Sequence, residues 1–516
     1  MNRNSLAAIL ICASIQCMLA QSGEWRETEA LLIKIPDEPN IAYTPRVSPT
    51  GRVAALVCTA DGKSSIVVNG KEGERFDEVY IVQFNPVAAV VNYIARLGKK
   101  MVFVCGEKKG PEFDDIPYFR CVPGGEAAGT GIMGRMFVPN QIPDGEKYAY
   151  WGVKDNKWTF VFGEKTWEGF ATSDHREADG GANIQLSPDG KHVAFEARSP
   201  DQKWSVVSDQ FTSSTADAAN LYGMTNGGQP VYCLYESDAW TLFVGATKIG
   251  KHAQIGAVAF TPDGSRLVYP ATTQRNGETG VFDNGKQVAA HLLSGPIVLS
   301  PDGKSYAYFA GGEGKTTLVL NGKEAAKSYE YCFAQPLFSP DSAHIVYPAR
   351  KSAKKWVMVL DGVESEEFDM TNYPVFSPDS KTLGFVGSSF ADVNHDVNFM
   401  VLGGKKEANY AAVGNLVFSA DSRHYAYAAT LADAKGYSVV LDGKPSISTA
   451  GNRSLLTFSA NGTLVYQGTA TTVVVGEKIM SKEDLILTPP VFNAARTKIG
   501  YAAQKGNDVW WRVVEE

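Results

Sequence analysis

Residues 299–309 read Leu-Ser-Pro-Asp-Gly-Lys-Ser-Tyr-Ala-Tyr-Phe, and this stretch decides the fold. Serine first, proline second with φ near −65°, and glycine fourth are typical of a type I turn between two strands. The strand after the turn puts the large Tyr306 and Tyr308 on one face and the small Ala307 on the other. All three are apolar enough to be buried, so the pattern predicts a strand that is covered on both faces of its sheet.

The turn recurs along the chain at a spacing close to forty residues. From residue 261 to residue 459 successive copies are 39, 39, 38, 42 and 40 residues apart. The clear copies begin at Ser187, Thr261, Ser300, Ser339, Ser377 and Ser419. Weaker copies begin near Ser48, Asn85, Ile142, Met224, Ser459 and Asn493, which makes about twelve. Such a period is typical of a repeat architecture in which each copy is one structural unit.

Each copy predicts four strands. A third strand, such as residues 357–360, ends in Asp361-Gly362, a dipeptide that favours a type I′ hairpin and a fourth strand beyond it. Four strands in about forty residues form one propeller blade. Twelve blades exceed the four to eight that are typical of one ring, so we predict an all-β fold of tandem β-propellers. The expected rings span residues 24–255 and 256–516, divided six plus six or five plus seven.

The two ends of the chain bear on ring closure. The last repeat stops at its third strand, residues 510–514, while residues 30–35 form a spare apolar strand near the start. This strand could close a ring and so remove an unpaired edge. A closure that joins both termini would argue against two independent rings.

The S-P-D-G-K turn, the A-Y strand after it and the later D-G-K hairpin resemble the WD-like repeats of the TolB propeller and its bacterial relatives. The resemblance covers nearly the whole chain after the N-terminal leader, and it implies propeller blades. The chain departs from TolB itself, because the repeat begins by Ser48 and leaves no room for the α/β domain that precedes the TolB propeller. A role in the Tol system is therefore not carried over.

The N-terminus has the layout of a secretory signal peptide. Arg3 precedes an apolar stretch over residues 6–15, followed by small and polar residues at 20–23. We expect residues 1–22 to direct export to the periplasm or the cell exterior, with cleavage after Ala20 or after Ser22. No other apolar run approaches the roughly 20 residues that span a bilayer, so the exported chain is not expected to cross a membrane.

The net charge and the cysteines of the chain limit which partners, lipid attachments and disulfides we expect. A net charge of −7 offers no basic face, so we expect no nucleic-acid partner. Ile11 and Gln16 precede Cys12 and Cys17 and are too large for a lipid-attachment signal. The cysteines after the leader are Cys58, Cys105, Cys121, Cys233 and Cys332. Their odd number and irregular spacing predict no disulfide framework, although Cys105 and Cys121 could bridge one loop.

Two motifs suggest ligand sites. Residues 129–134, Gly-Thr-Gly-Ile-Met-Gly, match a dinucleotide fingerprint but lack the strand-turn-helix context, so no nucleotide or other cofactor is predicted. Asp392, Asn394 and Asp396 have the spacing that opens a calcium loop. Val397 stands where glycine is needed and Gly403 where glutamate is needed. A solvated hairpin tip is the alternative to this weak metal site.

The histidines have a simpler interpretation. His192, His344 and His424 occupy the same place in three repeats, five residues after the turn serine, where other repeats carry Arg266 or Thr382. Blades of a ring are too far apart to share one metal, so we interpret this as a tolerant strand-start position. His175 lies in a polar loop and is interpreted as part of a solvated cluster with Asp174, Glu177 and Asp179.

The irregular stretches at residues 106–136, 171–183 and 208–230 interrupt the first half. Loops on a rigid scaffold often bind partners, although neutral loop growth would give the same pattern. The chain has no G-x-S-x-G and no H-E-x-x-H motif, and the sequence identifies no catalytic or binding residue. We therefore predict a non-enzymatic binding or scaffolding module for a protein or glycan. The alternative is a propeller hydrolase or lyase that acts on a sugar or peptide through carboxylates in a central funnel.

Overall fold

A computed structural model describes most of the chain after residue 25. The described residues are 26–34, 46–47, 54–60, 62–69, 71–84, 90–116, 149–171, 184–274, 277–291, 293–312, 314–333, 335–390, 396–430, 437–449, 456–482, 485–487, 490–493, 495–506 and 508–515. Every regular element among them is a strand, and all pairings between the strands are antiparallel.

The described strands group into twelve sheets, named here by their first and last strands. In the first half they are β2–β5 (Arg46–Val47, Ala54–Ala60, Lys63–Val68, Lys71–Phe76), β6–β9 (Glu78–Phe84, Val91–Leu97, Lys100–Cys105, Lys108–Phe113), β10–β12 (Ala149–Lys154, Lys157–Phe162, Lys165–Ala171), β13–β15 (Ile184–Leu186, Val193–Arg198, Trp204–Ser208) and β16–β19 (Ala218–Met224, Pro230–Glu236, Ala239–Val244, Thr247–His252).

The next sheets are β20–β24 (Gln254–Ile255, Ala259–Phe260, Leu267–Thr272, Thr279–Asp283, Lys286–Ala290), β25–β28 (Val298–Leu299, Tyr306–Gly312, Lys315–Leu320, Lys323–Tyr329), β29–β33 (Tyr331–Cys332, Leu337–Phe338, Ile345–Ser352, Lys355–Leu360, Val363–Glu364), β34–β37 (Met370–Phe376, Leu383–Phe390, Asp396–Leu402, Lys405–Lys406), β38–β41 (Ala412–Phe418, Tyr425–Thr430, Tyr437–Leu441, Lys444–Thr449) and β42–β45 (Thr457–Phe458, Leu464–Thr469, Thr472–Val475, Lys478–Lys482). The last sheet joins β46 (Leu485–Ile486), β47 (Val491–Phe492), β48 (Lys498–Lys505) and β49 (Asp508–Glu515) to β1 (Arg26–Lys34).

The turn and the hairpin of sheet β25–β28 have the geometry that their residues favour. In sheet β25–β28 the N–H of Gly303 donates to the carbonyl oxygen of Ser300 at 2.8 Å, and Gly303 has a φ of 71°. Asn321 and Gly322 both have positive φ, 49° and 78°, as a type I′ hairpin requires. The all-β fold of repeated, propeller-type antiparallel sheets is therefore confirmed.

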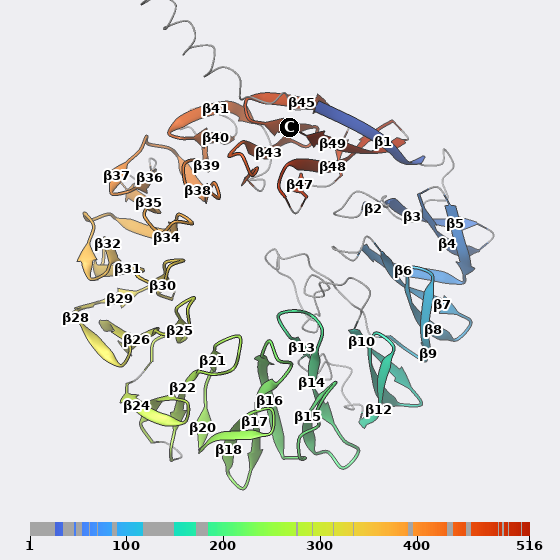
Figure 1. The fold of residues 1–516 in the computed structure, drawn as a ribbon, viewed down its shortest axis with the longest axis horizontal. Helices are drawn as coiled ribbons and strands as arrows, with labels where there is room; N and C mark the ends of the chain where they lie inside the picture. The colour runs from blue at the N-terminus through green and yellow to red at the C-terminus, as the bar shows by residue number, and fades with distance from the viewer. Residues whose placement is uncertain are drawn as a thin grey trace, which may run out of the picture.

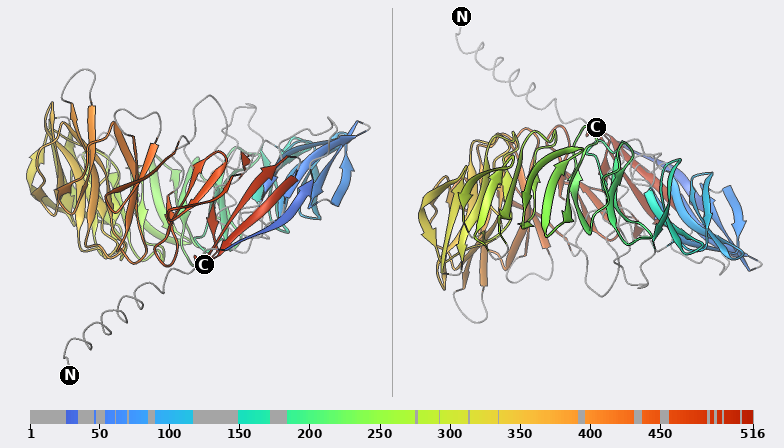
Figure 2. Two further views of the ribbon diagram at one scale, coloured as in Figure 1. Left: turned by 90° about the horizontal axis from the view of Figure 1, so that it is seen from above. Right: turned by 90° about the horizontal axis from the view of Figure 1, so that it is seen from below.

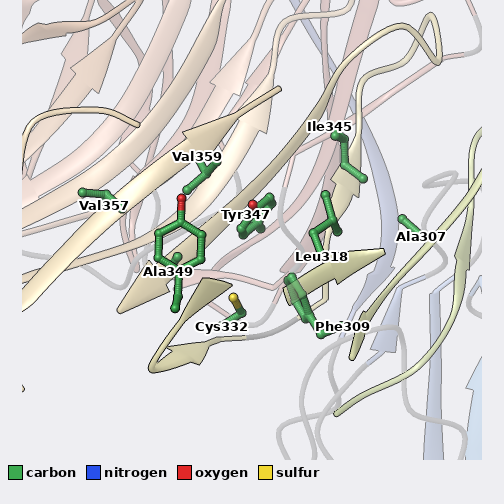
Figure 3. Packing of buried hydrophobic residues seen from close by; sticks show 10 residues of the cluster. Ala307, Phe309, Leu318, Cys332, Ile345, Tyr347, Ala349, Val357 and Val359 are labelled. Carbon is green, nitrogen blue, oxygen red and sulfur yellow. The ribbon is translucent and has the colours of Figure 1, made fainter. Parts of the chain in front are cut away.

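Neighbouring sheets pack face to face. Five consecutive residues at the start of β31, Ile345 to Ala349, are buried, so the strand is covered on both faces. On one face Tyr347 packs with Phe309 of the preceding sheet, and Cys332 lies in the same cluster (Figure 3). On the other face Val346 packs with Phe385 of the following sheet. Burial on both faces, as the size alternation predicts, makes each sheet depend on its two neighbours.

The sheets follow one another around one circle in chain order (Figure 1). In sheets such as β25–β28, β34–β37 and β38–β41 the first strand lies toward the axis and the last strand outside, whereas β1 forms the outer edge of the closing sheet. Seen from the side they form a band about one strand length thick (Figure 2). β1 pairs with β49, with Arg26 opposite Glu515 and Thr28 opposite Val513, so the spare N-terminal strand joins the two ends of the chain.

The expected division into rings of residues 24–255 and 256–516 does not match this arrangement. Residue 255 ends β20 and residue 259 begins β21, and both strands pair with β22 in one sheet. The angle between neighbouring sheets decides how many sheets complete a circle. That angle depends on the side chains packed between the sheets, and the repeat length carries no information about it.

Candidate functional site

Several sequence candidates lie outside the described residues. These are the fingerprint at 129–134, the cluster around His175, and Asp392 and Asn394. Asp396 is the first residue of β36 and pairs with Phe390 across the sheet. Among the residues that the structure describes, no group of three or more His, Cys, Asp or Glu side chains is placed to hold a metal ion.

The three equivalent histidines each contact an acidic residue of their own sheet. The distances from Nδ1 to the carboxylate are 3.0 Å for His192 and Asp209, 2.6 Å for His344 and Asp361, and 2.7 Å for His424 and Asp442. Arg266 occupies the same place in sheet β20–β24, and its Nη2 donates to Asp283 Oδ2 at 2.7 Å. The residue at this place in the repeat therefore links the start of the strand that follows the turn to an aspartate at the end of the next strand.

The aspartates of the repeated turns form hydrogen bonds within their own turns. Ser187 Oγ donates to Asp189 Oδ1 at 2.6 Å, and the N–H of Lys191 donates to the same oxygen. These bonds favour the ionised carboxylate, and they lower the pKa of Asp189 to about 2. The pKa values of the corresponding aspartates are also lowered, with the hydrogen bond from the turn hydroxyl as the largest cause; they are Asp263, Asp302, Asp341, Asp379 and Asp421.

A cleft opens where an inner strand is interrupted. β22 contains Pro270, which has no N–H to donate to a neighbouring strand. The strand beside it is split into β20 and β21, which pair with β22 on either side of this proline. Gly256 lies in the gap, where an added Cβ would come within 2.7 Å of Pro270 Cγ.

The cleft lies between sheets β16–β19 and β20–β24 and has a volume of about 430 Å³. It falls in the range of small-molecule sites, roughly 300 to 1,000 Å³. The preceding sheet contributes residues from its first three strands, and the following sheet contributes the interrupted strand and the two strands beyond it. The lining residues are Asn220, Tyr222, Cys233, Trp240, Gln254, Ile255, Gly256, Pro270, Ala271, Thr272 and Thr279, with Leu293 from the connection to the next sheet.

The lining is uncharged. Tyr222 Oη and Cys233 Sγ lie 3.4 Å apart. Burial raises the pKa of the Cys233 thiol to about 12 and raises the pKa of Tyr222 still further above neutrality, so both groups are protonated at pH 7. Among the described residues that line the cleft, none carries a formal charge. Their polar groups are amides and hydroxyls.

One hydroxyl in the lining stands out. Thr272 is 8% exposed, and its Oγ1 is buried without a hydrogen-bond partner among the described residues. Buried polar groups in proteins are nearly always hydrogen-bonded. Because this oxygen has almost no accessible surface, other atoms of Thr272 line the cleft and the hydroxyl itself does not face it.

Sequence reasoning did not find these residues. The segment 208–230, expected as a possible contact loop, does contribute Asn220 and Tyr222, but it does so from strand β16. Trp240 lies at the start of β18, as aromatic residues do in other repeats, and Pro270 follows a buried tyrosine in β22. A proline inside a strand marks a gap in the adjoining ladder, but Pro348 of β31 faces the same kind of gap between β29 and β30, so this signal does not by itself locate the cleft.

The remaining expectations can be stated briefly. Cys233 and Cys332 are buried free thiols, and Cys105 is also buried. Cys121 lies outside the described residues, as does the side chain of Cys58. No helix long and apolar enough for a membrane span occurs in the described part of the chain.

No family model and no curated protein matches this chain. Similar solved structures include a eukaryotic initiation factor, at 12% identity over 69% of this chain and 95% of that chain, with a TM-score of 0.34. An oligogalacturonate lyase in complex with manganese matches at 14% identity over 58% and 96%, with a TM-score of 0.25. A putative TolB from Agrobacterium tumefaciens matches at 16% identity over 39% and 84%, with a TM-score of 0.21. The chain's own antiparallel sheets, arranged in a circle, make it an all-β protein of the propeller type.

Proposed function

We propose that this chain is an exported binding protein that holds its partner, a glycan or a protein, in the cleft between sheets β16–β19 and β20–β24. The observation that carries the proposal is the cleft itself, which combines aromatic side chains with uncharged polar groups. Export is supported by the signal-like pattern of residues 1–22.

The lining favours binding over catalysis. Hydrolases and lyases need a group that gives or takes a proton near neutral pH. The described lining contains no carboxylate and no imidazole, and burial keeps the Cys233 thiol and the Tyr222 phenol protonated. The packed sheets on both sides hold the cleft walls in place, and such preorganisation lowers the entropic cost of binding.

Glycan and peptide arrays probed with the exported chain test this proposal. Trp240→Ala removes the largest aromatic group from the lining. Trp204→Ala is the matched control, because Trp204 begins β15 as Trp240 begins the equivalent part of β18 but does not line the cleft. We expect at least one array compound to bind the unmodified chain and Trp204→Ala, and to bind Trp240→Ala at least tenfold more weakly.

The same arrays can overturn the proposal. If no compound binds, or if every bound compound binds all three proteins equally, the cleft is not the binding site. Thermal unfolding of each variant, measured beforehand, confirms that the compared proteins are folded.

A further inference from the structure

We infer that His252 makes the interface between sheets β16–β19 and β20–β24 sensitive to acid, because a proton on its imidazole loosens strand β19 from the following sheet. Trp240, which lines the cleft, pairs with His252 and loses its fixed position at the same time. This is a regulation of the cleft, and its effect on a bound partner rests on the proposed binding function. The inference depends on the burial of His252, on its missing hydrogen-bond partner and on a second histidine at the same place in the next sheet.

His252 is the last residue of β19 and is buried against the next sheet, with 6% of its surface exposed. Its ring centroid lies 4.3 Å from that of Phe282, on β23, and its Nε2 lies 3.2 Å from Tyr269 Oη, on β22. Its Nδ1 is buried and has no hydrogen-bond partner among the described residues. A neutral imidazole carries one N–H, whereas an imidazolium carries two. Protonation therefore places a charge and an unpaired N–H inside the interface, which favours exposure of the ring to water.

The titratable groups on this face of the interface stay neutral. Burial raises the pKa of Tyr269 to about 12 and that of the Cys233 thiol, on β17, to about 12. Neither group can balance a positive charge on His252 at pH 5 to 8. Burial also lowers the pKa of His252 from its ordinary value of 6.5.

Two carboxylates lie near the same sheet, and both have other partners. Asp238 accepts a hydrogen bond of 3.3 Å from Tyr235 Oη. Glu196, in the preceding sheet, accepts a hydrogen bond of 2.6 Å from the N–H of Leu221. Among the described residues, no carboxylate forms an ion pair with His252. A proton on His252 is therefore left without an opposite charge.

His291 occupies the same place in sheet β20–β24, 39 residues further along the chain. Each histidine contacts a tyrosine 17 residues after it, Tyr269 for His252 and Tyr308 for His291. His291 Nδ1 lies 2.7 Å from Tyr308 Oη, and its Nε2 lies 3.2 Å from Glu324 Oε1. Both nitrogens of a protonated His291 thus have an acceptor, and one acceptor is a carboxylate. The fold therefore provides for a proton at His291 and not at His252.

Trp240 connects His252 to the cleft. The two residues are direct partners across β18 and β19, so their side chains lie on the same face of the sheet. On the other side of Trp240, the ring centroid of Tyr235 lies 5.2 Å away. Trp240 is held between these two neighbours, and departure of His252 frees one side of it. Acid therefore loosens an aromatic wall of the cleft.

The lowered pKa of His252 sets the direction of the response. A histidine whose folded pKa is lowered contributes stability that is present above the unfolded value of about 6.5 and is lost as the pH falls through the folded pKa. Between pH 7.5 and pH 5.0, protonation of the exposed ring can raise the opening equilibrium of β19 by at most about thirtyfold.

Hydrogen exchange with mass spectrometry on the exported chain, at pH 7.5, 6.0 and 5.0 and corrected for the intrinsic exchange rates, measures this opening. We expect peptides that cover β19 to lose protection by about fivefold to thirtyfold at pH 5.0. Peptides that cover β24, which precedes His291, are the internal control and should change by less than about twofold.

His252→Phe removes the titrating group and keeps an aromatic ring, as later sheets do at this place; their residues are Tyr329, Phe368 and Tyr410. The exchange of β19 in this variant should depend on pH as little as that of β24. His252→Leu, with a smaller side chain, is the second variant if the phenylalanine lowers the unfolding midpoint at pH 7.5.

A fluorine NMR spectrum of the chain labelled with 5-fluorotryptophan reports on the cleft wall. Trp240→Phe identifies the signal of Trp240. We expect this signal to shift or broaden between pH 7.5 and pH 5.0 in the unmodified chain and to stay unchanged in His252→Phe.

The outcomes separate this inference from the proposed function. Equal loss of protection in β19 and β24, no loss in β19, or a loss that persists in the His252 variants would overturn the inference. A Trp240 signal that does not respond while β19 opens would also overturn it, because the cleft would then be unaffected. None of these measurements uses a ligand, so each of these results leaves the binding function standing. Arrays without any binding sensitive to Trp240→Ala would overturn the binding function and leave the acid response intact.

Discussion

The N–H of Asp341 donates a hydrogen bond of 3.1 Å to Ser380 Oγ, which joins the turn of sheet β29–β33 to the turn of the next sheet. The same bond links Asp302 to Ser342 and Asp379 to Ser422. All three serines stand at the fourth turn position with a φ between 61° and 66°, where other copies of the turn have glycine. The serine thus adopts a strained backbone conformation and gains a contact between sheets.

Replacing Ser380 tests this exchange. Ser380→Ala keeps the strained φ and loses the hydrogen bond, so we expect the unfolding free energy to fall by about 1 kcal/mol. Ser380→Gly loses the same bond but relieves the strain, which is worth roughly 1 kcal/mol, and should be close to neutral. Urea unfolding followed by tryptophan fluorescence measures both. If Ser380→Ala and Ser380→Gly lower the unfolding free energy by the same amount, the backbone strain at residue 380 does not contribute to stability.

The His344–Asp361 contact predicts a pH dependence. The hydrogen bond to Asp361 raises the pKa of His344 above its usual 6.5. A raised folded pKa gives stability that is fully present below the unfolded value of about 6.5 and is lost as the pH rises through the folded pKa. The unfolding midpoint of His344→Gln should therefore lie below that of the unmodified chain at pH 5.5 and approach it at pH 8.5. An equal gap at both values would contradict the prediction.

Close packing between two sheets predicts the effect of a single methyl group. A Cβ added at Gly152, on β10, would meet the ring of Phe113, on β9, at 2.3 Å, and Phe113 is buried. Gly152→Ala should cost about 1 to 3 kcal/mol, as overpacking of a core does. Adding Phe113→Leu should restore part of that loss, since the smaller side chain makes room. Chemical unfolding of the two single variants and the double variant gives their coupling, and strictly additive effects would mean that the two residues do not touch.

Closure by β1 predicts the behaviour of a shortened chain. Removing residues 1–34 exposes the edge of β49, and unpaired strand edges favour association with other chains. We expect this variant to form oligomers or aggregates, as measured by size-exclusion chromatography with light scattering. A chain that lacks residues 1–25 and keeps β1 is the control. The prediction fails if the two shortened chains have the same mass in solution and the same unfolding midpoint.

The sequence by itself determined the local structure. Ser300, Asp302 and Gly303 specify their turn because each residue favours the dihedral angles or hydrogen bonds of its own position, and Asn321-Gly322 specifies the hairpin in the same way. The alternation of Tyr306 and Ala307 indicated burial on both faces, and the apolar residues near the N-terminus indicated a closing strand. These signals are local, so they can be interpreted without knowing where the rest of the chain lies.

Only the tertiary structure decided how the sheets are arranged and where a ligand could bind. The arrangement in one circle depends on the sum of small angles between sheets, each set by side-chain packing across an interface. The cleft depends on Pro270 facing a gap in the neighbouring strand and on Tyr222 reaching it from another sheet. Such relations join residues about fifty positions apart, and no spacing along the chain encodes them.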